Sequence, residues 1–201
     1  MEKRQCYITS FELLIILIVR NIRLELDITG EELSKYLKKN PKYIGHIESS
    51  NSDSKYTEEV LYQVANYFTL VAKKLKSELP KNGTKNFKTS YSNLDLQPSE
   101  IQGRDKVLKV IPPIPPGSGS ASTLNAVIEN TKFFDKAKTL EEIVNHCNKL
   151  QNQTWTSSDF TDALSRAVKG KNKRLEVVIV DGRNTYIKYK PKKESIDKKV
   201  D

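Results

Sequence analysis

Apolar residues recur at helical spacing through the first third of the chain. The run FELLIILIV at residues 11–19 predicts a helix over residues 11–26, because it supplies more apolar positions than any loop would carry. The stretch ITGEEL follows it, and there Thr29 stands three residues before Glu32. This spacing is the capping box that begins a helix, so a second helix is predicted from Thr29 to about Lys38.

Two further helices are predicted before residue 80. Asn40 and Pro41 have the residue types of a helix start, and Ile44 and Ile47 then share one face of the helix that follows. Thr57 caps a longer amphipathic helix that runs to residue 68 or on to residue 79.

A different composition separates this region from the rest. The segment PKNGTKNFKTSYSNLDLQPSE is polar and rich in turn residues, and IPPIPPGSGSAS joins a proline-rich part to a Gly/Ser-rich part. Such segments are typical of linkers, stiff and then flexible. We therefore expect a domain at 1–79, a flexible linker at 80–121, a domain at 122–191 and a basic tail at 192–201.

The second domain shows three helical segments and a hairpin. A helix is expected over residues 124–134, a second follows a capping box at Thr139, and a third begins after Thr156. The sequence KRLEVVIV-DGRN-TYIKYK then predicts two strands around an Asp-Gly turn.

Charge favours a polyanionic partner. The chain of 201 residues carries a net charge of +9, with 29% charged and 37% hydrophobic residues. Residues 1–79 are nearly neutral, with 12 basic and 11 acidic groups, whereas residues 124–201 carry 16 and 11. The excess therefore lies in the linker and the second domain.

Residue types that carry catalysis or bind metals are sparse. The two cysteines, Cys6 and Cys147, and the two histidines have no zinc-ligand spacing, and the sequence contains no glycine-rich phosphate loop and no nucleophile elbow. We expect no enzymatic activity, no cofactor and no metal. The run at residues 11–19 is too short to span a bilayer, so a soluble, cytoplasmic (nucleoid-associated) protein without membrane contact is expected.

The sequences ITGEELSKYLKKNPKYIGHIESS and YTEEVLYQVANYF together resemble the Cro/lambda-repressor (XRE) family of helix-turn-helix DNA-binding proteins. This resemblance covers about residues 11–70. It implies that the helix after Asn40 enters the major groove of duplex DNA, with Lys42 and His46 on the bases and Tyr43 on a base edge or a phosphate. It also implies phosphate contacts by Thr29 and Lys55 and a structural ion pair between Arg23 and Glu48, and Lys39 and Asn40 complete the DNA-binding set.

The order of three helices and a hairpin resembles a winged helix at the level of the fold. That resemblance implies a recognition helix over residues 156–169 and a wing tip at residues 181–184. The candidates for DNA contact in this domain are Ser157, Ser158, Arg166, Lys169, Lys171, Lys173 and Arg183. Winged helices also serve as dimerisation or partner-docking modules, and that alternative stays open.

The expected fold class is mainly α: an N-terminal five-helix helix-turn-helix domain plus a C-terminal α+β winged-helix-like domain with a β-hairpin. The expected function is a sequence-specific transcriptional regulator of the repressor type that acts by operator occupancy, as a homodimer by family resemblance. The apolar run at residues 11–19 would form the dimer contact or belong to the core. The alternatives are a non-catalytic protein-interaction adaptor or antitoxin-like partner, and an RNA-binding protein.

Overall fold

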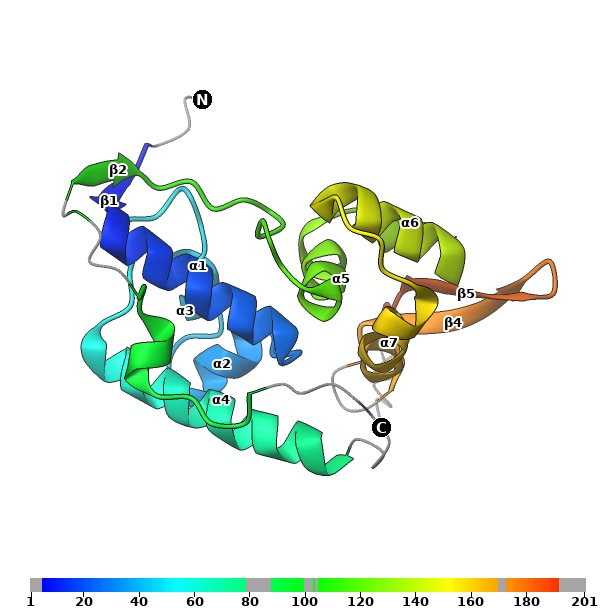
Figure 1. Ribbon diagram of the computed structural model, residues 1–201, viewed down its shortest axis with the longest axis horizontal. Coiled ribbons are helices and arrows are strands. Elements are labelled where there is room, and N and C mark those ends of the chain that lie inside the picture. The colour runs from blue at the N-terminus through cyan, green and yellow to red at the C-terminus, as the bar shows by residue number, and fades with distance from the viewer. Residues whose placement is uncertain (1–4, 79–87, 100–102, 104, 170–172, 192–201) are drawn as a thin grey trace, which may run out of the picture.

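Helix α1 (Ser10–Glu25) organises the N-terminal part of the chain (Figure 1). The computed structural model describes residues 5–78, 88–99, 103, 105–169 and 173–191. The helix begins one residue earlier than expected because Thr9 caps it. The Thr9 hydroxyl accepts a hydrogen bond from the Glu12 backbone N–H, and the Glu12 carboxylate accepts one from the Thr9 N–H. None of the described helices is both long enough and apolar enough to cross a membrane.

Three more helices complete this part, namely α2 (Gly30–Tyr36), α3 (Tyr43–Ile47) and α4 (Glu58–Glu78). The capping box predicted at Thr29 is present, with the Thr29 hydroxyl 3.1 Å from the Glu32 nitrogen. The described residues as far as Glu78 hold four α-helices, where five were expected.

Helix α3 is shorter than the sequence predicted. The side-chain oxygen of Asn40 accepts a hydrogen bond from the Lys42 N–H at 2.9 Å, and the Asn40 carbonyl oxygen accepts one from the Tyr43 N–H at 2.8 Å. These contacts form a turn over residues 40–42. The helix therefore starts at Tyr43.

The apolar run of α1 is covered by the chain itself. Ile15, Ile16 and Val19 are buried in a core shared with α2, α3 and α4. The other apolar residues of the run are at least partly buried, and α5 (Ser120–Asn130) packs along the same helix. Much of the run therefore belongs to the core, and its remaining apolar side chains are partly buried.

Residues 105–119, which we call the strap, differ from the flexible linker expected there. Strand β1 (Tyr7–Thr9) pairs antiparallel with β2 (Lys106–Leu108), with Ile8 opposite Val107. Lys109 is only 1% exposed, and its ammonium group donates to the carbonyl oxygens of Ser52 and Ser54 at 2.9 and 2.7 Å. Because backbone pairing and a buried cation both hold it, the strap is bound to the N-terminal part along its length.

Proline carbonyls of the strap add to this attachment. The guanidinium group of Arg20 donates to the carbonyl oxygens of Pro112 and Pro113, the latter at 2.9 Å. Proline cannot donate a backbone hydrogen bond, but its carbonyl oxygen accepts one. Upstream, the short helix η1 (Asn93–Leu96) places Leu96 in the N-terminal core.

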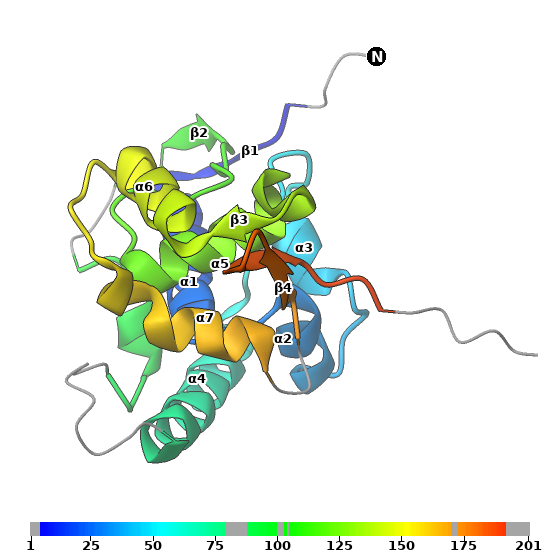
Figure 2. The ribbon, with the colours of Figure 1, turned by 90° about the vertical axis from the view of Figure 1, so that its right-hand side faces the viewer.

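The second part of the chain contains α5, α6, α7 and a three-stranded antiparallel sheet in the order β3-β5-β4 (Figure 2). Its elements after α5 are η2 (Phe133–Asp135), β3 (Lys138–Thr139), α6 (Leu140–Gln151), η3 (Ser157–Phe160), α7 (Thr161–Val168), β4 (Leu175–Val180) and β5 (Arg183–Lys188). The predicted hairpin is confirmed. Its two-residue turn, Asp181 and Gly182, has φ angles of 51° and 73°, as a tight hairpin turn requires.

Polar side chains join the two parts across α1 and α5. The Asn125 side chain donates to the Leu24 carbonyl oxygen at 2.7 Å, and the Ser122 hydroxyl donates to the Asn21 side chain at 2.6 Å. These groups are buried or partly buried, so their hydrogen bonds replace water and fix the orientation of the helices. Overall the described chain is mainly helical with two small antiparallel sheets. The predicted basic tail at 192–201 lies outside the described residues.

Candidate nucleic-acid interface

Helix α3 is anchored by one face only. Ile44 and Ile47 are fully buried against α2, α4 and α1. The backbone N–H of Ile44 donates to the Ser34 hydroxyl at 3.1 Å, and this hydroxyl donates to the Gly30 carbonyl oxygen at 2.7 Å. The Ser34 hydroxyl of α2 thus accepts from a backbone N–H at the start of α3 that has no carbonyl partner within its own helix. This contact holds α2 and α3 at a fixed angle.

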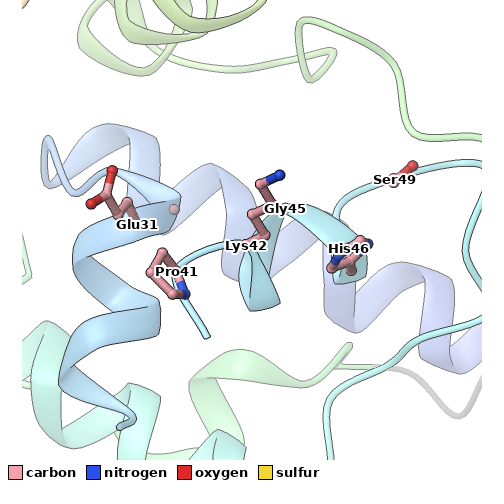
Figure 3. Close-up of a pocket in the computed structure, with 7 residues that line it drawn as sticks. Glu31, Pro41, Lys42, Gly45, His46 and Ser49 are labelled. Carbon is pink, nitrogen blue, oxygen red and sulfur yellow. The ribbon is translucent and has the colours of Figure 1, made fainter. Parts of the chain in front are cut away.

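The opposite face of α3 is open. Lys42, Gly45 and His46 are exposed and border a shallow groove of about 390 Å³, which Pro41 and Ser49 extend (Figure 3). Across the groove lies Glu31 at the start of α2, where it forms an ion pair with Lys35 at 2.7 Å. The groove therefore carries three side chains that can donate hydrogen bonds, those of Lys42, His46 and Ser49, with one carboxylate at its rim.

Tyr43 has a mixed position. It is partly buried against the N-terminal core, and this burial raises the pKa of its hydroxyl. The ammonium group of Lys39 lies 6.0 Å from the centre of its ring. Lys39 and Asn40 are exposed, at the turn before α3.

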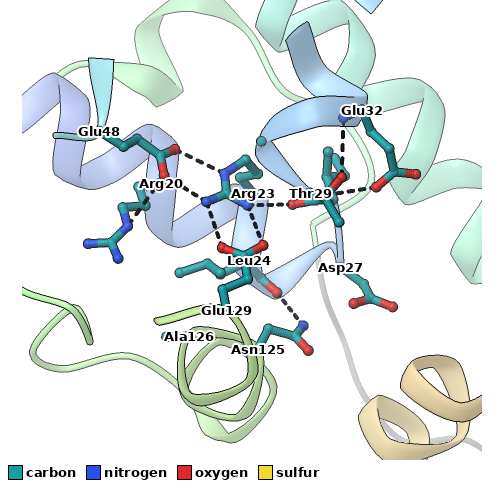
Figure 4. Close-up of polar contacts among 12 residues, drawn as sticks. Arg20, Arg23, Leu24, Asp27, Thr29, Glu32, Glu48, Asn125, Ala126 and Glu129 are labelled. Carbon is teal, nitrogen blue, oxygen red and sulfur yellow. Dashed lines mark hydrogen bonds and ion pairs between the residues drawn. The ribbon is translucent and has the colours of Figure 1, made fainter. Parts of the chain in front are cut away.

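The predicted ion pair between Arg23 and Glu48 is present. Nε and Nη2 of Arg23 lie 2.9 and 2.7 Å from the two carboxylate oxygens of Glu48, at the end of α3 (Figure 4). This two-pronged geometry is the strongest arrangement of such a pair. It ties the end of α3 to α1.

Sequence reasoning missed two further members of this network. Arg23 also binds Glu129 of α5, with Nη1–Oε1 and Nη2–Oε2 distances of 3.0 and 3.1 Å, and Arg20 lies 3.4 Å from Glu48. Burial alone would lower the pKa of Arg23, but the two carboxylates hold that pKa well above its ordinary value. No local pattern joins residues 106 positions apart, so the sequence carries no signal for Glu129.

The two residues expected at phosphates in the N-terminal part have internal partners. Thr29 uses its hydroxyl to cap α2, and the exposed ammonium group of Lys55 forms an ion pair with Glu12. Lys55 stands in the loop that Lys109 holds through Ser52 and Ser54. Neither residue lines the groove beside α3.

Arg166 of α7 contacts the N-terminal part of the chain. Its Nε lies 3.6 Å from the Asp27 carboxylate, which also forms an ion pair with Arg174. Burial raises the pKa of Asp27, and the two arginines oppose that rise. Arg166 thus joins the two parts of the chain, which differs from the DNA contact expected of it.

The other candidates of the second part are dispersed. Ser157 and Ser158 are exposed on η3, with the Ser158 hydroxyl 2.7 Å from that of Thr156, and Lys169 is exposed after α7. The ammonium group of Lys173 lies 4.6 Å from the centre of the Tyr189 ring, and Arg183 is exposed beside the hairpin turn. None of these residues lines the groove of α3. Lys171 lies outside the described residues.

The described residues offer no group of side chains arranged to hold a metal ion. Cys6 and Cys147 are both buried, and burial raises the pKa of the Cys147 thiol to about 12. His146 stacks on Phe133 at 4.0 Å between ring centres.

No protein-family model, curated protein or solved structure matches the chain. Its function is therefore argued from its own residues.

Proposed function

We propose that the chain is a sequence-specific DNA-binding transcriptional regulator that reads duplex DNA with α3 and acts by occupying an operator. One observation carries this proposal. Lys42 and His46 are exposed on a short helix whose isoleucines, Ile44 and Ile47, are fully buried. One face of the helix is anchored in the core and the other is exposed to a ligand, as an element that reads base pairs requires.

The chemistry of the groove suits the edges of base pairs. The ammonium group of Lys42 would donate to O6 and N7 of guanine, and His46 would donate to a guanine or to a phosphate oxygen. Gly45 stands between them, and apart from its chain neighbours and the backbone of α3 no atom lies within 4 Å of the position of an added Cβ. A base pair or a sugar can therefore approach the helix backbone closely at this residue.

The arrangement of α1 to α4 supports the assignment of α2 and α3 as a helix-turn-helix. The second part has the order helix, strand, helix, helix, hairpin, which supports a winged-helix assignment. We assign this second part a supporting role. Its arginines Arg166 and Arg174 are engaged with Asp27, and Glu129 reaches the ion pair that holds α3.

This assignment implies that both parts move as one body when DNA is bound. Arg23 links the end of α3, through Glu48, to α5, through Glu129. A protein fixed in this way would block an operator by its bulk, with no catalytic step.

The proposal is tested by selecting bound sequences from a random duplex library with the full chain at low salt. An enriched sequence that is lost with Lys42→Ala and His46→Ala would support it. If no duplex is enriched, DNA reading is wrong and the protein-interaction adaptor is favoured. Enrichment from a single-stranded RNA library in place of duplex DNA would favour RNA binding.

A further inference from the structure

Strand β4 exposes an unusual run of aliphatic side chains. Val177, Val178, Ile179 and Val180 are 43%, 39%, 72% and 41% exposed, whereas Leu175 at the base of the strand is buried. The β4–β5 hairpin projects away from the helices, at the right in Figure 1. Four consecutive exposed β-branched residues are rare on a protein surface unless another chain covers them.

The backbone of β4 is also open on one side. The strand lies at the edge of the sheet, and among the described residues only β5 pairs with it. The two-residue turn makes Val180 and Arg183 a hydrogen-bonded pair, so the backbone N–H and C=O groups of the even-numbered residues of β4 point toward β5. The hydrogen bond from the Tyr189 N–H to the Arg174 carbonyl oxygen agrees with this register. The backbone N–H and C=O groups of Leu175, Val177 and Ile179 therefore point to the open edge.

The chemistry of this edge is unsuited to DNA. Its exposed side chains are aliphatic, and the hairpin tip begins with the exposed carboxylate of Asp181. A phosphate backbone would meet no cation along β4 but would meet the carboxylate of Glu176 within the strand and that of Asp181 at its end. An apolar strand with the same hydrogen-bonding pattern is the occupant that fits.

We propose that β4 pairs antiparallel with β4 of a second copy of this chain, across a two-fold axis at Val177. This pairing joins two three-stranded sheets into one and covers the aliphatic run with its own copy. It goes beyond the proposed function, because it needs no DNA and would hold for a protein-binding role as well.

The charges near the ends of β4 favour this register over the one with the two-fold axis at Val178. With the axis at Val177, Leu175 lies opposite Ile179 of the second copy, and Lys173 lies opposite Asp181 of the second copy at both ends. Moving the axis to Val178 keeps the open groups paired but sets Leu175 opposite Asp181 of the second copy, and Lys173 then lies beyond the hairpin turn of that copy, where β4 has ended. Opposite charges across a strand pair stabilise it, and of these two registers only the axis at Val177 sets Lys173 opposite Asp181, so that axis is favoured.

The self-pairing is tested first by the mass of the full chain in solution without DNA, measured by sedimentation equilibrium. The expected result is a dimer of twice the 23.0 kDa chain mass. The double variant Val177→Lys with Ile179→Lys should raise the dissociation constant at least tenfold. The control Val110→Lys changes a residue that is 56% exposed outside the hairpin and should leave that constant unchanged.

A wild-type chain that stays monomeric at high concentration would overturn the proposal. A dimer whose dissociation constant is the same in the double variant, Val177→Lys with Ile179→Lys, as in the control Val110→Lys would also overturn it. Circular dichroism of the variants separates a lost interface from a lost fold.

Two cysteine variants, Val177→Cys and Ile179→Cys, test the register by cross-linking and do not require that the interface be destabilised. Val177→Cys should form an intermolecular disulfide under mild oxidation, because two residues facing each other across the axis have Cα atoms about 5.5 Å apart. Ile179→Cys should not, because its two copies would lie roughly 13 Å apart along the strands. The native Cys6 and Cys147 are buried and do not compete. Cross-linking through Ile179→Cys, or through neither variant, would overturn the register.

Discussion

Arg23 on α1 and Glu129 on α5 form an ion pair at 3.0 Å, although 106 positions separate them in the sequence. The guanidinium group is almost fully buried and the carboxylate is 21% exposed. Because Arg23 also holds Glu48 at the end of α3, this pair connects the proposed reading helix to the second part of the chain.

Removing Glu129 should destabilise the whole chain. Glu129→Ala eliminates two charge-assisted hydrogen bonds to Arg23, and we expect a loss of about 1.5–3 kcal/mol in the free energy of unfolding. The control is Glu78→Ala, at the exposed end of α4 and 3.8 Å from Lys74, which should change that free energy by less than about 0.5 kcal/mol. Urea denaturation gives both values, and equal losses would show that the pair does not join the two parts.

Lys109 should be protected from chemical modification in the native protein. Its ammonium group is buried against Ser52 and Ser54, whereas Lys106, three residues earlier, is exposed. An amine-acetylating reagent followed by peptide mass spectrometry should therefore modify Lys106 and spare Lys109, and modify both in denaturant. Equal modification of the two lysines in the native protein would show that Lys109 is not buried, and it would favour a flexible linker over a bound strap.

Gly45→Ala should stabilise the fold and weaken DNA binding. Alanine in place of glycine stabilises an exposed helix position by roughly 0.5–1 kcal/mol, and apart from its chain neighbours and the backbone of α3 no atom lies within 4 Å of the added methyl group. That methyl group enters the groove between Lys42 and His46. Asn66→Ala, on the exposed face of α4, is the control that changes helix propensity away from the groove. If Gly45→Ala leaves the affinity for a selected duplex unchanged, DNA does not approach α3 closely at this residue.

His146 should contribute to the pH dependence of stability. Burial first, and then the charges of Lys138 and Lys149, lower the pKa of His146 below its ordinary value of 6.5. The unfolded chain then binds a proton that the folded chain resists, so this contribution is complete above pH 6.5 and is lost as the pH falls through the lower, folded pKa. Unfolding free energies of the wild type and His146→Gln, measured from pH 8 to pH 5, should converge as the pH falls. Parallel curves would contradict the prediction.

Local signals in the sequence located most of the helices and the hairpin. Thr29 with Glu32, and Thr139 with Glu142, begin helices where the capping pattern placed them. The Asp-Gly dipeptide likewise predicted the position of the hairpin turn. Each of these signals acts within a few residues, so it can be read without knowledge of the fold.

Contacts between distant residues could not be read in this way. The segment around IPPIPPGSGSAS has the composition of a linker, yet Arg20 binds its proline carbonyls and Lys109 is buried beside it. The composition predicts a segment without regular structure, yet its last residues begin α5 at Ser120, and composition carries no sign that other parts of the chain bind the rest. The contact of Arg166 with Asp27 was missed for the same reason, because Asp27 stands 139 residues earlier.

The most direct test of the DNA-reading claim is the affinity of the full chain for a selected duplex, measured by fluorescence anisotropy over a range of salt concentrations. The double variant Lys42→Ala with His46→Ala should lose at least about tenfold in affinity, as expected for one lost base contact or more. The control Lys73→Ala, an exposed lysine on α4, should lose little, and the wild-type affinity should fall steeply with salt. A double variant that binds as tightly as Lys73→Ala would contradict the assignment of α3 as the reading helix.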